Sequence, residues 1–139
     1  MKSDIFIDTS GFYSLLVKND GKHRSAAKIL AGARSGVYSF VTSDYVIDET
    51  VTLMKARGFR HIIPDFLRLV NSSNVCRIEW TDSERFEAAS KFCTKHLDQE
   101  YSFTDCLIMS VMKELGLKKI LTKDEHFKIA GFDAMLAEK

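Results

Sequence analysis

Short apolar segments with strand character alternate along this chain with longer segments that carry apolar residues at helical spacing. Strands separated by helices form βαβ units, whose strands run parallel and whose crossovers are right-handed. A parallel sheet is buried on both faces, so helices must cover it from two sides. The alternation therefore predicts an α/β fold with a parallel sheet between helices.

Cap and turn residues mark where the helices begin. Ser43 is placed to cap the helix that follows it. Thr81 and Glu84 have the spacing of a capping box. Either Ser102 or Thr104 can cap a later helix. Strands are expected at residues 4–8, 37–42, 75–80 and 118–122, with an edge strand at 132–136; helices are expected at 10–17, 22–34, 44–57, 61–70, 105–115 and 125–129, with another that begins near residue 81.

The length and the cysteines favour one cytoplasmic domain. A chain of 139 residues has the size of a single domain and can build a core without disulfides, so we expect residues 1–139 to form one domain. Its cysteines form no CxxC pair, which favours a reducing cytoplasm. The apolar run at residues 5–7 is too short for a signal peptide, and no stretch approaches the ~20 apolar residues of a membrane span.

The charge balance narrows the classes of ligand. Lys and Arg number 20 against 19 Asp and Glu, a net charge of +1, which excludes a strongly basic protein that coats phosphates. A nucleic-acid enzyme with a local basic groove is compatible with this balance. The chain has neither GxGxxG nor GxxxxGK[ST], so dinucleotide and P-loop chemistry lack their phosphate-binding loops.

Four acidic residues can converge at one edge of the predicted sheet. Asp8 ends the first strand, Asp124 follows the strand at 118–122, and Asp105 lies at a helix start. Glu49 lies in the second turn of the helix at 44–57, where its apolar neighbours predict partial burial. Ligands of open parallel sheets bind outside the carboxyl ends of the strands, which makes this edge the expected site.

Each acid also has a structural interpretation, because acids stabilise helix N-termini and initiate turns. For Asp105, a capping role and a catalytic role both stay open. Converging carboxylates repel one another and raise each other's pKa, and a hard divalent cation relieves the repulsion. Mg²⁺ and Mn²⁺ prefer oxygen ligands, and such a site can activate water for phosphodiester cleavage.

Several motifs together resemble the PIN domain family, and most closely the VapC-type toxin nucleases of VapBC toxin–antitoxin modules. These motifs are Asp8-Thr9-Ser10, Glu49 in the helix after the second strand, SFTD at 102–105 and TKDEHF at 122–127. The likeness covers essentially the whole chain, in order and in size. It implies a three-layer α/β/α sandwich around a mostly parallel sheet of four or five strands.

The resemblance also implies an activity, a cofactor and partners. It implies an endoribonuclease that depends on Mg²⁺ or Mn²⁺ and acts as the toxin of a type II toxin–antitoxin system. The catalytic and metal-binding quartet of the family corresponds to Asp8, Glu49, Asp105 and Asp124. Ser10 and Thr104 match hydroxyl positions that support the metal site. Toxin members form dimers and are inhibited by a small antitoxin that covers the cleft, which implies both partners for this chain.

One position departs from the family pattern. Some members carry another acid two residues after the fourth acid, where this chain has His126. We expect His126 to be a solvated helix residue, and a second metal ion stays open. Lys123, beside Asp124, is a candidate contact to an RNA phosphate. Ser10 is as compatible with an N-cap as with a metal-site hydroxyl.

Two alternative functions share these motifs. A housekeeping RNA-processing PIN nuclease would carry the same acids, and a silent PIN-like module could bind RNA or protein without cutting. The intact quartet argues against the silent module. The apolar side chains at 59, 62, 63, 66, 67 and 70 either pack in the core or dock a partner helix or a second subunit.

Overall fold

The computed structural model describes residues 3–72 and 74–138. At its centre lies a five-stranded sheet in the order β3-β2-β1-β4-β5, in which all neighbouring strands are parallel. The predicted parallel sheet is confirmed, and the last strand is the expected edge strand. The strands are β1 (Ser3–Ile7), β2 (Tyr38–Ser43), β3 (Cys76–Glu79), β4 (Lys119–Leu121) and β5 (Asp133–Ala134).

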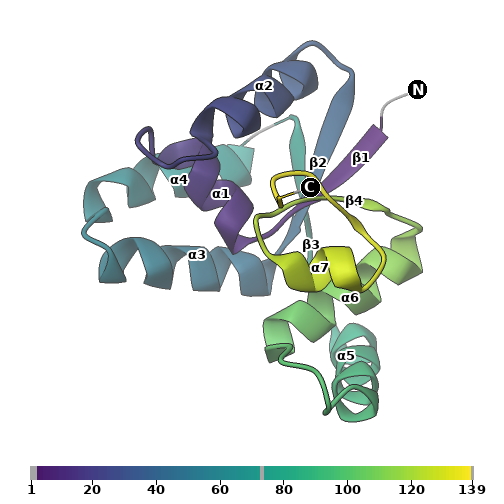
Figure 1. Ribbon diagram of the computed structural model, residues 1–139. Coiled ribbons are helices and arrows are strands. Elements are labelled where there is room, and N and C mark those ends of the chain that lie inside the picture. The colour runs from purple at the N-terminus through teal and green to yellow at the C-terminus, as the bar shows by residue number, and fades with distance from the viewer. Residues whose placement is uncertain (1–2, 73, 139) are drawn as a thin grey trace.

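Helices cover the sheet on two sides (Figure 1). The crossovers from β1 to β3 run in one direction along the sheet, and those from β3 to β5 run back. Right-handed crossovers therefore place the helices of the two halves on opposite faces, which confirms the three layers. The helices are α1 (Thr9–Leu16), α2 (His23–Arg34), α3 (Asp44–Ala56), α4 (Ile63–Ser72), α5 (Ser83–Lys95), α6 (Phe103–Leu115) and α7 (Glu125–Ile129), with a 3₁₀ turn at Arg60–Ile62.

The hydrophobic core runs through the sheet and both helix layers. Residues 5–7 of the central strand β1 are completely or almost completely buried, as is most of α6 between Cys106 and Met112. Phe66 of α4 packs edge-on against Phe12 of α1, with 4.9 Å between the ring centroids. Phe66 and Val70 therefore belong to the core, while the other apolar side chains of that segment are half-buried. Within the described residues, no helix combines the length and apolar character needed to cross a membrane.

One predicted helix start is wrong. Asp82, and not Thr81, is the N-cap of α5, because its side chain accepts a hydrogen bond from the backbone N–H of Arg85 at 2.8 Å. The hydroxyl of Thr81 donates instead to Asp44 of α3, at 2.6 Å. The predicted capping box with Glu84 fails because a tertiary contact takes the hydroxyl that it needs.

Helix α1 and strand β4 approach each other closely at Gly11. A Cβ at this position would lie 2.1 Å from the carbonyl oxygen of Leu121 and 3.0 Å from the side chain of Ile7. The oxygen belongs to the backbone of β4, so the strand would have to shift to make room. Glycine is required here by the contact between the two elements.

We expect Gly11→Ala to lower the free energy of unfolding by about 2 kcal/mol or more, because it overpacks a rigid backbone contact. Urea unfolding followed by circular dichroism measures this change. Gly21→Ala is the matched control, since nothing lies within 4 Å of its Cβ position, and it should change stability by less than about 0.5 kcal/mol. Equal stabilities of the two variants would contradict the close approach.

Candidate active site

The carboxylate of Asp8 is buried where β1 meets α1. Asp8 is the N-cap of α1, and its Oδ1 accepts a hydrogen bond from the Gly11 N–H at 2.9 Å. The Ser10 hydroxyl donates to the same oxygen at 3.0 Å, and the Thr122 hydroxyl donates to Oδ2 at 2.6 Å. Ser10 is therefore not the helix cap, and its hydroxyl holds the Asp8 carboxylate instead.

Burial makes a charged Asp8 unfavourable. Desolvation raises its pKa from 3.8 to about 6, although the hydrogen bonds from Thr122, Gly11 and Ser10 oppose the rise. The nearby charge of Asp124 adds to the increase. Burial and the same neighbour also raise the pKa of Asp105. The mutual repulsion expected from the sequence is therefore present at Asp8 and Asp105.

Asp105 and Asp124 both reach the site from the start of a helix. Asp105 forms a capping box with Ser102, in which each side chain accepts from the other residue's backbone N–H at 3.0 Å. Asp124 is the N-cap of α7 and accepts from the His126 N–H at 2.8 Å. Of the two caps proposed for α6, Ser102 is therefore the one used. The capping interpretation of Asp105 is correct, and it does not remove the residue from the site.

Glu49 lies on the exposed side of α3. The expected partial burial is wrong: Glu49 is exposed, although Val46 and Thr50 in the same helix are buried. The hydroxyl of Thr9 donates to Oε1 of Glu49 at 2.5 Å. Because Thr9 directly follows Asp8 in the chain, this hydrogen bond holds the Glu49 carboxylate near the end of β1.

These acids share one cleft of about 220 Å³ at the carboxyl ends of β1 and β4. The four predicted acids, Ser10 and Lys123 all line it, whereas Thr104 is not among the described residues that do. The parallel topology thus produces the convergence that the strand ends predicted. The lining residues are Asp8, Thr9, Ser10, Tyr13, Glu49, Leu53, Arg57, Asp105, Lys123 and Asp124.

Two threonines organise the site and were missed from the sequence. Thr9 holds Glu49, and Thr122 holds Asp8 while its oxygen accepts from the Asp124 N–H at 3.0 Å. Their only sequence signal is their place within two residues of a predicted acid. Hydroxyls are common at such turns, so that signal by itself predicts a cap or a turn.

Two cations flank the ring of Tyr13 at the rim of the cleft. The Nζ atom of Lys123 lies 2.7 Å from Oδ1 of Asp20 and 5.4 Å from the ring centroid. The guanidinium carbon of Arg57 lies 5.0 Å from the same centroid. Burial alone would raise the pKa of Asp20, but the hydrogen bonds from Lys123 and its other partners hold that pKa below its ordinary value. Lys123 is thus ion-paired, whereas Arg57 is exposed to solvent.

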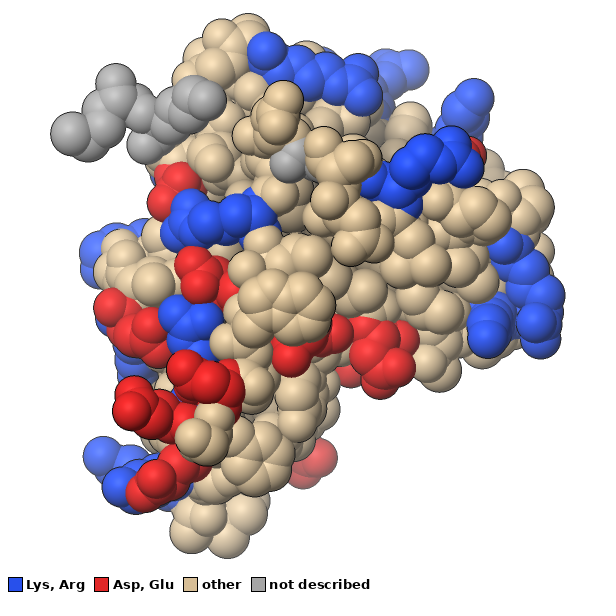
Figure 2. Space-filling view, turned by 180° about the vertical axis from the view of Figure 1, so that it is seen from behind, with Lys and Arg blue, Asp and Glu red and all other residues tan. Residues whose placement is uncertain are grey.

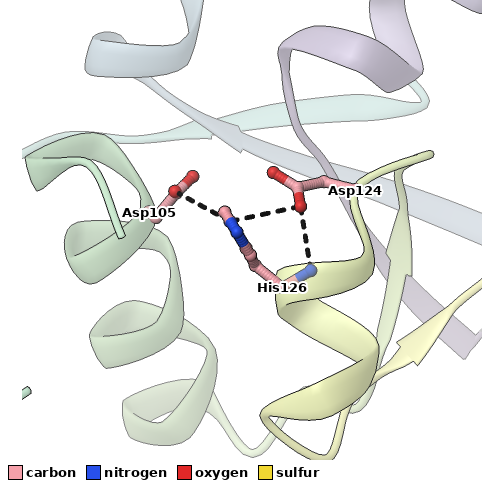
Figure 3. A group of neighbouring side chains, drawn as sticks. All are labelled: Asp105, Asp124 and His126. Carbon is pink, nitrogen blue, oxygen red and sulfur yellow. Dashed lines mark hydrogen bonds and ion pairs between the residues drawn. The ribbon is translucent and has the colours of Figure 1, made fainter. Parts of the chain in front are cut away.

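The imidazole of His126 points between Asp105 and Asp124 (Figure 3). Its Nδ1 lies 3.3 Å from Oδ1 of Asp124 and 3.9 Å from Oδ2 of Asp105. This atom is buried and makes no hydrogen bond within the part of the chain that the structure describes. We expected His126 to be a solvated helix residue. The side chain is 38% exposed, but its Nδ1 atom is buried, so the expectation is wrong for that atom.

The donor set fits a divalent cation. Asp105, Asp124 and His126 each offer one ligand atom, and these atoms lie within 4.8 Å of one another. Asp8 lines the cleft together with Asp105 and Asp124. The raised pKa values of Asp8 and Asp105 indicate carboxylates without enough compensating positive charge. A bound divalent ion is a large local charge that would reverse those shifts.

Comparison with known proteins agrees with this geometry. Residues 5–133 match the profile of the PIN domain. The chain is 32% identical over 129 residues to the 23S rRNA-specific endonuclease VapC20 in two strains of Mycobacterium tuberculosis, with 92% of this chain and 95% of the relative covered. The crystal structure of M. tuberculosis VapC20, described as a sarcin–ricin loop cleaving toxin, superposes with a TM-score of 0.82 at 30% identity over 92% of this chain and 95% of that chain.

We expect Asp8→Asn to stabilise the metal-free protein at neutral pH. Because the pKa of Asp8 is raised from 3.8 to about 6 in the folded chain, folding stability falls as the pH rises through that window. The uncharged amide removes this penalty, so the free energy of unfolding should rise by about 2 kcal/mol near neutral pH. The gain should shrink as the pH falls and disappear below about pH 3, where the acid is protonated in both the folded and the unfolded state.

Urea unfolding in EDTA across this pH range measures the difference. Asp98→Asn serves as the control, because Asp98 is exposed and outside the cleft lining. A constant difference at every pH, or a loss of stability at neutral pH, would show that burial does not penalise the Asp8 charge.

Proposed function

The chain belongs to the PIN domain family, and we propose from this that it is a divalent-metal-dependent endoribonuclease, the toxin of a type II toxin–antitoxin system. The observation that carries the activity is the convergence of four carboxylates on one cleft. The relative VapC20 is a 23S rRNA-specific endonuclease, which supports RNA as the substrate. That likeness favours a toxin over a housekeeping nuclease, and the converging acids argue against a silent binding module.

We assign metal binding and catalysis to Asp8, Glu49, Asp105 and Asp124, with Mg²⁺ or Mn²⁺ as the cofactor. A divalent ion bound there supplies charge for the scissile phosphate and lowers the pKa of a bound water. The chain's own contribution is to hold the ligands rigidly. Thr122 fixes Asp8, Thr9 fixes Glu49, and the caps of α6 and α7 fix the other two acids.

RNA binding rests on the rim of this cleft. On the face seen from behind, Figure 2 shows Lys and Arg in separate groups, with acidic side chains gathered at its centre and lower left. Arg57, Lys123 and Tyr13 lie together at the rim and can contact the phosphates and bases of the RNA. Because Asp20 already pairs with Lys123, Arg57 is the stronger candidate for a phosphate contact.

The proposed partners follow from the same family. We propose a small antitoxin that covers the cleft and a second copy of this chain, with residues 1–139 as a single nuclease domain. An apolar groove of about 500 Å³, lined in part by Leu16, Val17, Phe59 and Ile62, supports docking of a partner helix. The free thiols and the RNA substrate support a cytoplasmic location.

We expect purified protein to cleave RNA with Mn²⁺ or Mg²⁺ and not with EDTA. Ribosomal RNA is the first substrate to test, because the relative cuts 23S rRNA. Asp105→Asn should lower the rate at least about 100-fold, since it removes a charged metal ligand. Cleavage is read on sequencing gels, after any co-purified partner has been removed.

Asp98→Asn is the matched control for this experiment and should keep full activity, because Asp98 lies outside the cleft lining. Full activity of the Asp105→Asn protein would contradict the assignment of this cleft as the active site. A folded protein that binds metal but cuts no RNA would instead favour the silent binding module.

We expect Arg57→Ala to weaken RNA binding and to reduce its salt dependence. Each phosphate contact on a single strand contributes about 0.7 to the slope of log affinity against log salt concentration, so the slope should fall by about that amount. Fluorescence anisotropy with labelled RNA, in Asp105→Asn protein that does not cleave, measures both. Arg34→Ala, at the end of α2 and outside the cleft lining, should leave the slope unchanged; an equal effect would remove Arg57 from the RNA path.

A further inference from the structure

The position of His126 distinguishes this site from one built of carboxylates alone. Its Nδ1 is buried, lacks a hydrogen-bond partner among the described residues, and lies 3.3 Å from Asp124 and 3.9 Å from Asp105. A ring nitrogen buried without a hydrogen bond has lost its contacts with water, and here only the two carboxylates at ion-pair distance stand in their place. A ligand bound between Asp105, Asp124 and His126 would give this nitrogen the partner that it lacks.

The ring is held in this orientation from two directions. The backbone N–H of His126 donates to the Oδ1 atom of Asp124 that lies beside Nδ1, at 2.8 Å. The ring of Tyr101 packs against the imidazole edge, at 5.8 Å between centroids and an interplanar angle of 69°. Because α7 begins at this point, its first turn carries the imidazole to the mouth of the acidic cluster.

A nitrogen ligand changes which metal the site prefers. Mg²⁺ takes oxygen ligands and keeps most of its waters, whereas imidazole nitrogen suits first-row transition ions. Imidazole suits Fe²⁺, Ni²⁺, Cu²⁺ and Zn²⁺, whereas an all-oxygen site suits Mg²⁺ and Mn²⁺. An acid at position 126 would add only oxygen donors, and the site would lose this discrimination.

We propose that Asp105, Asp124 and His126 together bind a first-row divalent transition ion, with Nδ1 of His126 as a direct ligand, in preference to Mg²⁺. This inference rests on the proposed nuclease function, because it assigns the ligands of the same metal site. Position 126 then sets the metal preference of the chain, while the acidic quartet sets its capacity to hold a divalent ion.

Pulsed electron paramagnetic resonance of Mn²⁺ bound to the wild-type protein tests the nitrogen ligand without an activity assay. The expected result is a ¹⁴N coupling typical of directly bound imidazole, lost in His126→Asp and in His126→Ala. His61→Ala is the matched control and should keep the coupling, because His61 is exposed and lies in the 3₁₀ turn outside the cleft lining. Absence of nitrogen coupling in the wild type would overturn the proposal whether or not the variants fold.

Titration calorimetry with Ni²⁺, an ion that imidazole suits, and with Mg²⁺ tests the preference. The ratio of the two affinities should fall at least about tenfold in His126→Asp, which restores an all-oxygen site. Asp is also well tolerated at the first turn of a helix, so this variant should stay folded. A ratio that is unchanged within about twofold would show that His126 only pairs with the carboxylates.

Failure of this inference and failure of the proposed function give different results. RNA cleavage with metal binding but without nitrogen coupling would overturn the inference and leave the nuclease in place. Nitrogen coupling that depends on His126, in a protein that cuts no RNA, would support the metal site and reject the nuclease. No binding of either metal to the wild type would overturn both.

Discussion

The buried carboxylate of Asp8 is the interaction on which the rest of the site depends. It receives hydrogen bonds from the start of α1 and from Thr122 just after β4, and so joins three elements at one point. Those bonds are possible because Gly11 lets α1 lie against the backbone of β4. Burial nevertheless leaves the charge undercompensated, which is why the pKa of Asp8 rises to about 6. The same desolvation that weakens the fold prepares an oxygen ligand for a cation.

Structural and functional roles coincide at the other acids. Asp8, Asp105 and Asp124 each accept backbone N–H groups at the start of a helix, where the helix dipole favours a negative charge. These caps hold the carboxylates at the strand ends, so the bonds that begin α1, α6 and α7 also aim the ligands. Substitution of any of these acids therefore changes both the free energy of unfolding and the metal site. Whether the substitution stabilises or destabilises the fold depends on the pH and on whether a metal ion is bound. The Tyr13 ring, with Arg57 and Lys123 against it, then adds positive charge at the rim of an otherwise acidic cleft.

Local patterns predicted most elements because the relevant forces act over a few residues. The observed bounds of α7 are the predicted ones, and Pro64 lies in the first turn of α4, where its missing N–H does no harm. The start of α5 was mispredicted because Asp44, distant in sequence, takes the hydroxyl of Thr81. The exposure of Glu49 was mispredicted because burial in a helix depends on which elements pack against each face, and apolar neighbours in sequence do not supply that information.

The linear pattern of residues is enough to predict the parallel α/β fold, since strand and helix periodicities alternate and crossovers have one hand. It also determined which acids reach the carboxyl edge, because Asp8, Asp105 and Asp124 stand at element ends. Which hydroxyls hold those acids, and where the imidazole of His126 points, depends instead on how distant segments pack together. Thr122 and Asp8 are 114 positions apart, and Thr9 and Glu49 are 40 apart. Contacts of that range depend on how elements pack, and neither propensity nor spacing along the chain contains that information.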